Sequence, residues 1–167
     1  MNNSETIYLS LGSNRGNKMQ NIIGAIEKLS HLLGTATAVA PIIETEPWGF
    51  SSCETFLNTV VSFDCTIAPE ELLQATQQIE RQLGRTKKSI DGQYSDRTID
   101  IDILFYGSRV VESPQLTIPH PLLHKRLFVL QPLAAIAPQL VHPTLKKSIK
   151  QLLDEADDKN KETALHH

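Results

Sequence analysis

The segment Arg97–Tyr106 reads RTIDIDILFY, with isoleucine or phenylalanine at every second position up to Phe105. Alternation of this kind predicts a half-buried β-strand over residues 98–106, whose isoleucines and Phe105 face the core. Asp100 and Asp102 then share the opposite face, with their Cα atoms about 6.6–6.8 Å apart. This strand therefore carries both an apolar face and a pair of carboxylates.

Two carboxylates on one strand repel each other, and aspartate is depleted in strands. One interpretation is a solvated sheet face with two exposed aspartates. The other is a pair of Mg²⁺ ions about 3.5–4 Å apart, bridged by Asp100, Asp102 and phosphate oxygens. The polar loop just before the strand favours the second interpretation, because its cationic residues would complement a nucleoside triphosphate. These are Arg85, Lys87, Lys88 and Arg97.

The elements before this strand follow a recognisable order. Periodicity predicts a helix that begins after a cap at Asn17 and ends at Gly34, and a second helix over 69–83 that begins with Pro69. Strands are expected over 5–11, 35–45 (with Pro41 at an edge or bulge), 56–65 and 98–106. The order βαββαβ predicts an α+β, ferredoxin-like fold with a mostly antiparallel sheet. Both helices would cover one face and leave the other free for a site.

A C-terminal β/α extension follows the last of these strands. We expect a short strand over 109–111, a loop to Pro121, and helical stretches over 122–137 and 146–153. Residues 1–153 would form a single domain. The acidic segment 154–167 has little to pack and is expected to be frayed or disordered.

Charge is distributed unevenly along the 167 residues, although the formal net charge is only −3. Residues 81–150 contain eleven basic and five acidic residues, whereas residues 1–80 contain three basic and nine acidic ones. This asymmetry indicates an anionic partner near the third quarter of the chain. No apolar run approaches the ~20 residues of a membrane span, and the N-terminus lacks a signal-peptide pattern. Two unpatterned cysteines fit a reduced protein, and we expect a cytoplasmic monomer.

Several further residues are candidates for ligand binding. His120 lies between Pro119 and Pro121 and is either a turn histidine or a site residue, with Arg126 close behind it. Phe56 alternates with Asn58, so an aromatic ring and an amide would share one strand face, as a flat heterocycle requires. The alternative is that the aromatic residues, Trp48 and Phe128 included, belong to the core.

Two other classes of function fit a ferredoxin-like sheet. A nucleic-acid-binding module would also carry aromatic and charged residues on its open face. The chain lacks the aromatic-rich strands of RNA-recognition modules, and the two aspartates would repel phosphates without a metal ion. A small metal-dependent regulatory domain without catalysis is the third possibility.

The chain to about Pro138 resembles the 6-hydroxymethyl-7,8-dihydropterin pyrophosphokinase family. The matching segments occur in the family's order and spacing: YLSLGSNRGN, ETEPWG, FLNTVV, PEELL with QIERQLGR, DRTIDIDILFYG and LTIPHPLLHKRLFVLQPLAAIAP. The resemblance implies transfer of a pyrophosphoryl group from ATP to the hydroxymethyl oxygen of the pterin, with AMP as the other product. The resemblance implies that the partners are these two small-molecule substrates, and that neither a membrane nor a nucleic acid is a partner.

The resemblance also implies a role for individual positions. Asp100 and Asp102 would hold two Mg²⁺ ions. The two aspartates, together with Arg85 and Arg97, would be the catalytic residues. ATP would be bound by Glu80, Arg85, Lys87, Arg97, His120 and Arg126. The pterin would contact Thr45, Trp48, Phe56, Asn58 and Phe128, with its ring between the two phenylalanines. Lys87 stands where family members often carry arginine, which keeps the charge but loses the bidentate fork.

Overall fold

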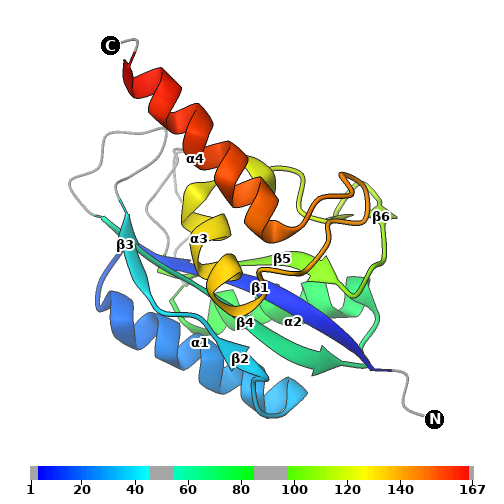
Figure 1. Ribbon diagram of the computed structural model, residues 1–167. Helices are drawn as coiled ribbons and strands as arrows, with labels where there is room; N and C mark the ends of the chain where they lie inside the picture. The colour runs from blue at the N-terminus through cyan, green and yellow to red at the C-terminus, as the bar shows by residue number, and fades with distance from the viewer. Residues whose placement is uncertain (1–3, 46–54, 85–97, 166–167) are drawn as a thin grey trace.

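The computed structural model describes residues 4–45, 55–84 and 98–165 (Figure 1). Its elements are β1 (Glu5–Ser13), α1 (Lys18–Leu33), β2 (Ala38–Val39), β3 (Ile43–Thr45), β4 (Phe56–Cys65), α2 (Pro69–Gln82), β5 (Asp100–Tyr106), β6 (Val111–Glu112), β7 (Thr117–Ile118), the 3₁₀ turn η1 (Leu123–Lys125), α3 (Leu127–Ile136) and α4 (Ile149–Leu165). Trp48, Arg85, Lys87 and Arg97 lie outside the described residues, so their predicted roles stay predictions.

One antiparallel sheet organises the fold. Its strands follow the order β2-β4-β1-β5, and β3 extends the pairing along β4. The two longest strands, β1 and β4, pair over the whole length of β1, from Glu5 opposite Cys65 to Ser13 opposite Leu57. The order and directions confirm the predicted βαββαβ, ferredoxin-like arrangement. β5, which carries the two aspartates, is an edge strand of this sheet.

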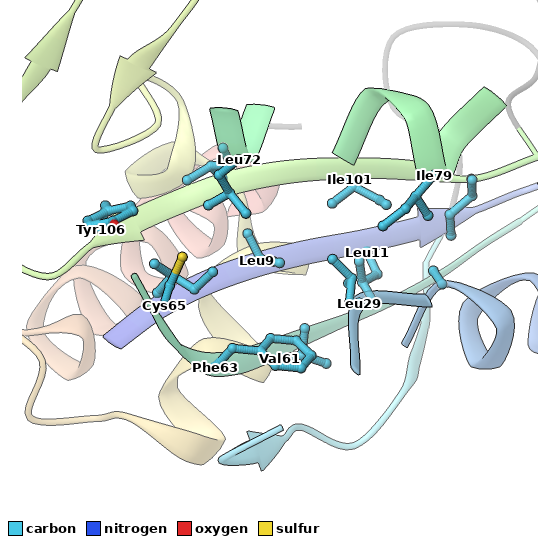
Figure 2. Packing of buried hydrophobic residues seen from close by; sticks show 14 of the residues in the cluster. Leu9, Leu11, Leu29, Val61, Phe63, Cys65, Leu72, Ile79, Ile101 and Tyr106 are labelled. Carbon is cyan, nitrogen blue, oxygen red and sulfur yellow. The ribbon is translucent and has the colours of Figure 1, made fainter. Parts of the chain in front are cut away.

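The first core lies between the sheet and the helices α1 and α2. Figure 2 shows the inward side chains of β1, β4 and β5 meeting those of both helices, with Leu9 and Ile101 near the centre. Local signals position α1: the Asn17 side chain accepts a hydrogen bond from the Gln20 backbone N–H, and Gly34 follows the helix with φ +93°. The predicted helix start and end are therefore confirmed.

The opposite face of the sheet is covered in part, which corrects the expectation of a free face. Val60 of β4 and Leu104 and Phe105 of β5 form a second buried cluster with Leu130 of α3 and Leu152 of α4. Figure 1 shows α3 and α4 on the side of the sheet away from α1 and α2. Apolar side chains on this face need a partner, and the C-terminal extension supplies it. The rest of this face carries polar residues, of which Asp100 and Asp102 are half-buried.

The alternation along β5 breaks before its end, which makes the predicted orientation of Phe105 wrong. Leu9 of β1 pairs with Ile103 of β5. The preceding residue of β1, Tyr8, would pair with Leu104 in a regular ladder, but it pairs with Phe105. Leu104 is therefore an additional residue on β5, a β-bulge. The bulge turns Phe105 into the second cluster and Tyr106 into the first.

Shorter elements also differ from the expectation. The strand predicted over 35–45 is two short strands, β2 and β3, separated by a stretch that includes Pro41, which lacks an N–H for the ladder. The strand expected over 109–111 is β6 at Val111–Glu112, and its partner β7 was predicted as loop. The helical stretch 122–137 is divided at Arg126 into η1 and α3.

The C-terminal helix is longer than predicted. α4 continues without interruption through Asp154 to Leu165, where the sequence predicted a frayed or disordered segment. Ser148 and Gln151 begin the helix with reciprocal side chain-to-backbone hydrogen bonds, and Ala156 packs against the second cluster. The Lys147 ammonium also lies 2.7 Å from the Glu155 carboxylate. Within the described ranges, no helix combines the length and apolar composition that crossing a bilayer requires.

Candidate active site

Two rows of residues cross the partly open face of the sheet. In the first row Asp100 of β5 lies opposite Gly12 of β1, which lies opposite Asn58 of β4. In the second row Asp102 lies opposite Ser10. Neighbouring strands are about 4.8 Å apart, so the Cα atoms of Asp100 and Asn58 are separated by roughly 10 Å. The carboxylates and the amide therefore lie at opposite ends of one short row.

The two aspartates have the orientation that the alternation predicts. Ile99, Ile101 and Ile103 are buried in the first core, and Asp100 and Asp102 are half-buried on the other side of the strand. Among the described residues, no three His, Cys, Asp or Glu side chains form a group that could hold a metal ion. Two carboxylates fit Mg²⁺, because this ion keeps several waters and takes substrate phosphates as further ligands. They do not fit a closed site made by protein ligands alone.

The amide of Asn58 is held in one orientation. Its Nδ2 donates a hydrogen bond of 2.8 Å to the hydroxyl oxygen of Thr45 on β3, and the residue is only 5% exposed. Phe56, two residues earlier on β4, is half-buried and lies opposite Thr45 in the ladder. Three of the five residues that the sequence analysis assigned to the pterin are therefore neighbours on two adjacent strands.

Arg126 and Phe128 enter the site from the start of α3. The Arg126 guanidinium lies over the Phe128 ring, 5.6 Å from its centre, in a cation–π arrangement. Both residues are half-buried, and Phe128 packs against the edge of the second cluster. α3 packs on β3 and β4, so it brings these two side chains to the face that carries Phe56 and Asn58.

His120 is held as a neutral imidazole with a defined tautomer. Its Nδ1 accepts a hydrogen bond of 3.1 Å from the Leu122 backbone N–H, so the ring proton resides on Nε2. Burial, and then the positive charge of Arg126, lowers the pKa of His120 to about 4, whereas Asp100 acts in the opposite direction. The charges of Arg126 and Asp100 therefore both act on His120. At neutral pH, His120 can offer a hydrogen-bond donor without adding charge.

A pocket of about 250 Å³ opens beside Asp102 and His120. Its apolar wall includes Leu73 of α2, and its rim includes Gln115 and Thr117, beside and within β7. The sequence analysis did not identify these lining residues. Thr117 directly precedes the IPHP segment that contains His120. A pocket of mixed polar and apolar lining next to the Asp102 carboxylate and His120 can hold the aromatic part of a charged ligand.

Glu80 reaches the site indirectly. This buried residue of α2 is 5% exposed, and its Oε2 accepts a hydrogen bond of 2.8 Å from the Ile101 backbone N–H. Ile101 stands between the two aspartates, and that N–H points away from β1. The observed contact of Glu80 is thus with the outer edge of β5, and its predicted contact with ATP stays a prediction.

The chain is similar to proteins of a known family. A family model described as "7,8-dihydro-6-hydroxymethylpterin-pyrophosphokinase (HPPK)" matches residues 8–138. This chain belongs to that family. The matched region contains every residue that forms the rows, the histidine contact and the pocket described above.

Relatives of this pyrophosphokinase family member occur in distant organisms. A 2-amino-4-hydroxy-6-hydroxymethyldihydropteridine pyrophosphokinase of Porphyromonas gingivalis is 47% identical over 138 residues, which cover 82% of this chain and 93% of the relative. The protein with the same name from Aquifex aeolicus is 37% identical, over 90% of this chain and 91% of its own. The folic acid synthesis protein fol1 of Pneumocystis carinii is 39% identical over 93% of this chain, which spans 20% of that longer protein.

Solved structures show the same fold. The crystal structure of wild-type Plasmodium falciparum HPPK-DHPS superposes with a TM-score of 0.75 over 98% of this chain, at 16% sequence identity. The chain spans 46% of that solved chain. The likeness establishes the ferredoxin-like fold of this family member and nothing about its ligands.

Replacing Glu80 distinguishes a hydrogen-bonding role from a charge role. Glu80→Leu leaves the buried Ile101 N–H without its carboxylate acceptor, so we expect the free energy of unfolding to fall by about 1–3 kcal/mol. Glu80→Gln keeps an acceptor oxygen and is expected to retain most of that stability and most of the activity. Urea unfolding and kcat measure the two effects. Equal losses in both variants would show that the charge, and not the contact with β5, matters.

The neutral state of His120 predicts a pH dependence of stability. The folded protein binds the His120 proton only near pH 4, whereas an unfolded chain binds it near the ordinary pKa of 6.5. The free energy of unfolding should therefore decrease as the pH falls from 6.5 towards 4. His120→Asn keeps an acceptor for the Leu122 N–H but does not titrate, so it is the matched control. The free energies of unfolding of wild type and variant are measured in urea between pH 7 and 4.5. A difference between them that stays constant over this range would contradict the lowered pKa of His120.

Proposed function

We propose that this chain transfers a pyrophosphoryl group from ATP to the hydroxymethyl oxygen of 6-hydroxymethyl-7,8-dihydropterin in folate synthesis. Membership of the pyrophosphokinase family supports this activity, as do relatives of that name at 37–47% identity. The observation that carries the proposal is the row Asp100–Gly12–Asn58. It places a carboxylate pair suited to a metal–phosphate group one short row away from an amide suited to a heterocycle.

The pterin would occupy the end of the row near Asn58. Phe56 and Phe128 come from opposite sides of that region, one from the sheet and one from α3, and would stack on the two faces of the ring. Thr45 accepts its hydrogen bond from Asn58, so its own hydroxyl proton is available as a donor. The pair can therefore recognise the donors and acceptors along one edge of the ring.

The triphosphate would lie at the other end of the row, with the adenine moiety in the pocket beside Asp102 and His120. Asp100 and Asp102 would hold Mg²⁺, two ions in our proposal, which supplies charge neutralisation of the phosphates and lowers the pKa of a bound hydroxyl. His120 would donate from Nε2 to a phosphate oxygen. Arg126 would neutralise phosphate charge directly.

The reaction is a single displacement at the β-phosphorus. The hydroxymethyl oxygen forms a bond to this phosphorus, the bond from the phosphorus to the α–β bridging oxygen breaks, and AMP leaves while the hydroxyl proton is released. Chemistry of this type depends on alignment and on electrostatic stabilisation, and it needs no covalent intermediate on the protein. The residues described here supply both: two stacking rings for alignment, and Arg126 and His120 for the phosphates.

Other parts of the prediction rest on the sequence alone. Contacts of Arg85, Lys87 and Arg97 with the phosphates and of Trp48 with the pterin are proposed from the positions that match the family's motifs. The cytoplasmic location and the monomeric state stay predictions.

The product of the nucleotide tests this proposal. Purified protein with ATP, Mg²⁺ and 6-hydroxymethyl-7,8-dihydropterin should form AMP in proportion to the pterin consumed, and excess EDTA should abolish the reaction. Asp100→Asn should lower kcat at least about 100-fold, because it removes a metal-binding charge. The Asp100 side chain points away from the first core, so the circular dichroism of this variant should match that of the wild type. Formation of ADP, or turnover without pterin, would overturn the proposed chemistry.

A further inference from the structure

Gly12 lies at the centre of the row that joins the two halves of the site. It stands on β1 between Asp100 and Asn58, at the start of the GSN segment to which the proposed chemistry assigns no role. A Cβ atom placed on Gly12 would lie 2.9 Å from Oδ1 of Asn58 and 3.9 Å from its Cγ. The first distance is shorter than van der Waals contact between carbon and oxygen. The Asn58 amide therefore occupies the space that any other residue at position 12 would need.

The backbone does not explain this glycine. The described glycines with positive φ are Gly16, Gly34, Gly84 and Gly107, and Gly12 has no such conformation. Gly12 instead pairs regularly with both neighbouring strands. An alanine at position 12 would fit the strand conformation, and glycine in a strand interior is otherwise unfavourable. The requirement for a missing side chain thus comes from Asn58 and not from a turn.

The Asn58 amide has little freedom to avoid an added methyl group. Its Nδ2 donates to the Thr45 hydroxyl on the side of β3, which directs Oδ1 towards β1 and Gly12. The residue is 5% exposed, so its surroundings are already filled. A methyl group on residue 12 would displace the end of this side chain, and the displacement would break or bend the hydrogen bond to Thr45.

We propose that Gly12 is a positioning residue: it leaves the space in which the Asn58 amide lies flat across β1, in the orientation that recognises the pterin edge. The inference rests on the proposed function for the identity of the ligand. Because the clash involves the tip of a side chain and not the backbone, Gly12→Ala should alter ligand recognition far more than it alters folding.

A double-mutant cycle tests whether Gly12 acts through Asn58. The variants are Gly12→Ala, Asn58→Ala and the two together. The readout is the Kd of 6-hydroxymethyl-7,8-dihydropterin, from its fluorescence, in the presence of Mg²⁺ and a non-hydrolysable ATP analogue. Gly12→Ala should weaken pterin binding at least about tenfold, the equivalent of one lost hydrogen bond. In the Asn58→Ala background the same substitution should change the Kd less than about twofold. The Kd of the ATP analogue should stay within about twofold of wild type throughout.

Gly24→Ala is the matched control. Gly24 lies on α1, away from the row, and its added methyl group would also meet the end of a side chain, Cδ2 of Leu83 at 3.2 Å. It should leave the pterin Kd unchanged. A second readout is independent of any ligand: the side-chain amide signals of Asn58 in a ¹⁵N–¹H spectrum should shift in Gly12→Ala and not in Gly24→Ala.

Three results would overturn the inference. These are an unchanged pterin Kd in Gly12→Ala, an equal loss in both backgrounds of the cycle, and Asn58 amide signals that do not move. If Gly12→Ala alone does not fold, recovery of the fold in the double variant supports the clash, and failure of both contradicts it. Wild-type protein that binds no pterin would refute the proposed function, and the amide spectrum would still decide the role of Gly12.

Discussion

The site depends on how antiparallel strands align side chains into rows. Register places Asp100, Gly12 and Asn58 side by side across three strands, and alternation directs the side chains of Asp100 and Asn58 to the same face. Helices α1 and α2 pack on the other face, so the fold rests on the first core while Asp100 at the end of this row stays half-buried. A shift of one residue in the pairing of β5 with β1 would turn the carboxylates of β5 towards the first core and its isoleucines away from it. The proposed metal, phosphate and heterocycle sites all depend on this one register.

The two rows combine residues that a sheet selected for stability alone would avoid. Two aspartates on one strand repel each other, and a glycine between paired strands contributes no packing. The structure offsets these costs nearby. The Glu80 carboxylate satisfies the outer edge of β5 at Ile101, and α3 and α4 bury the apolar part of the same face. The neutral state of His120 also adds no further charge to a region that already contains Asp100 and Arg126.

Most of the fold could be predicted from the sequence, because strict alternation, helix caps and apolar periodicity are local signals. The face of Asp100 and Asp102, the cap at Asn17 and the order of the elements are examples. What could not be predicted depends on contacts between distant segments. The bulge at Leu104 arises in the pairing with Tyr8, Glu80 meets Ile101 across 21 positions, and the pocket beside Asp102 needs the β6–β7 hairpin. The continuation of α4 likewise depends on packing, through Ala156, that its charged sequence conceals.

The most direct test of the account is a crystal structure with Mn²⁺, a non-hydrolysable ATP analogue and 6-hydroxymethyl-7,8-dihydropterin, analysed by anomalous scattering. We expect two manganese peaks about 3.5–4 Å apart, each bound by a carboxylate of Asp100 or Asp102. The pterin ring should lie between Phe56 and Phe128, with one edge on Asn58. Manganese bound away from both aspartates, or a pterin outside the two phenylalanines, would contradict the central claim that one row across the sheet joins both substrates.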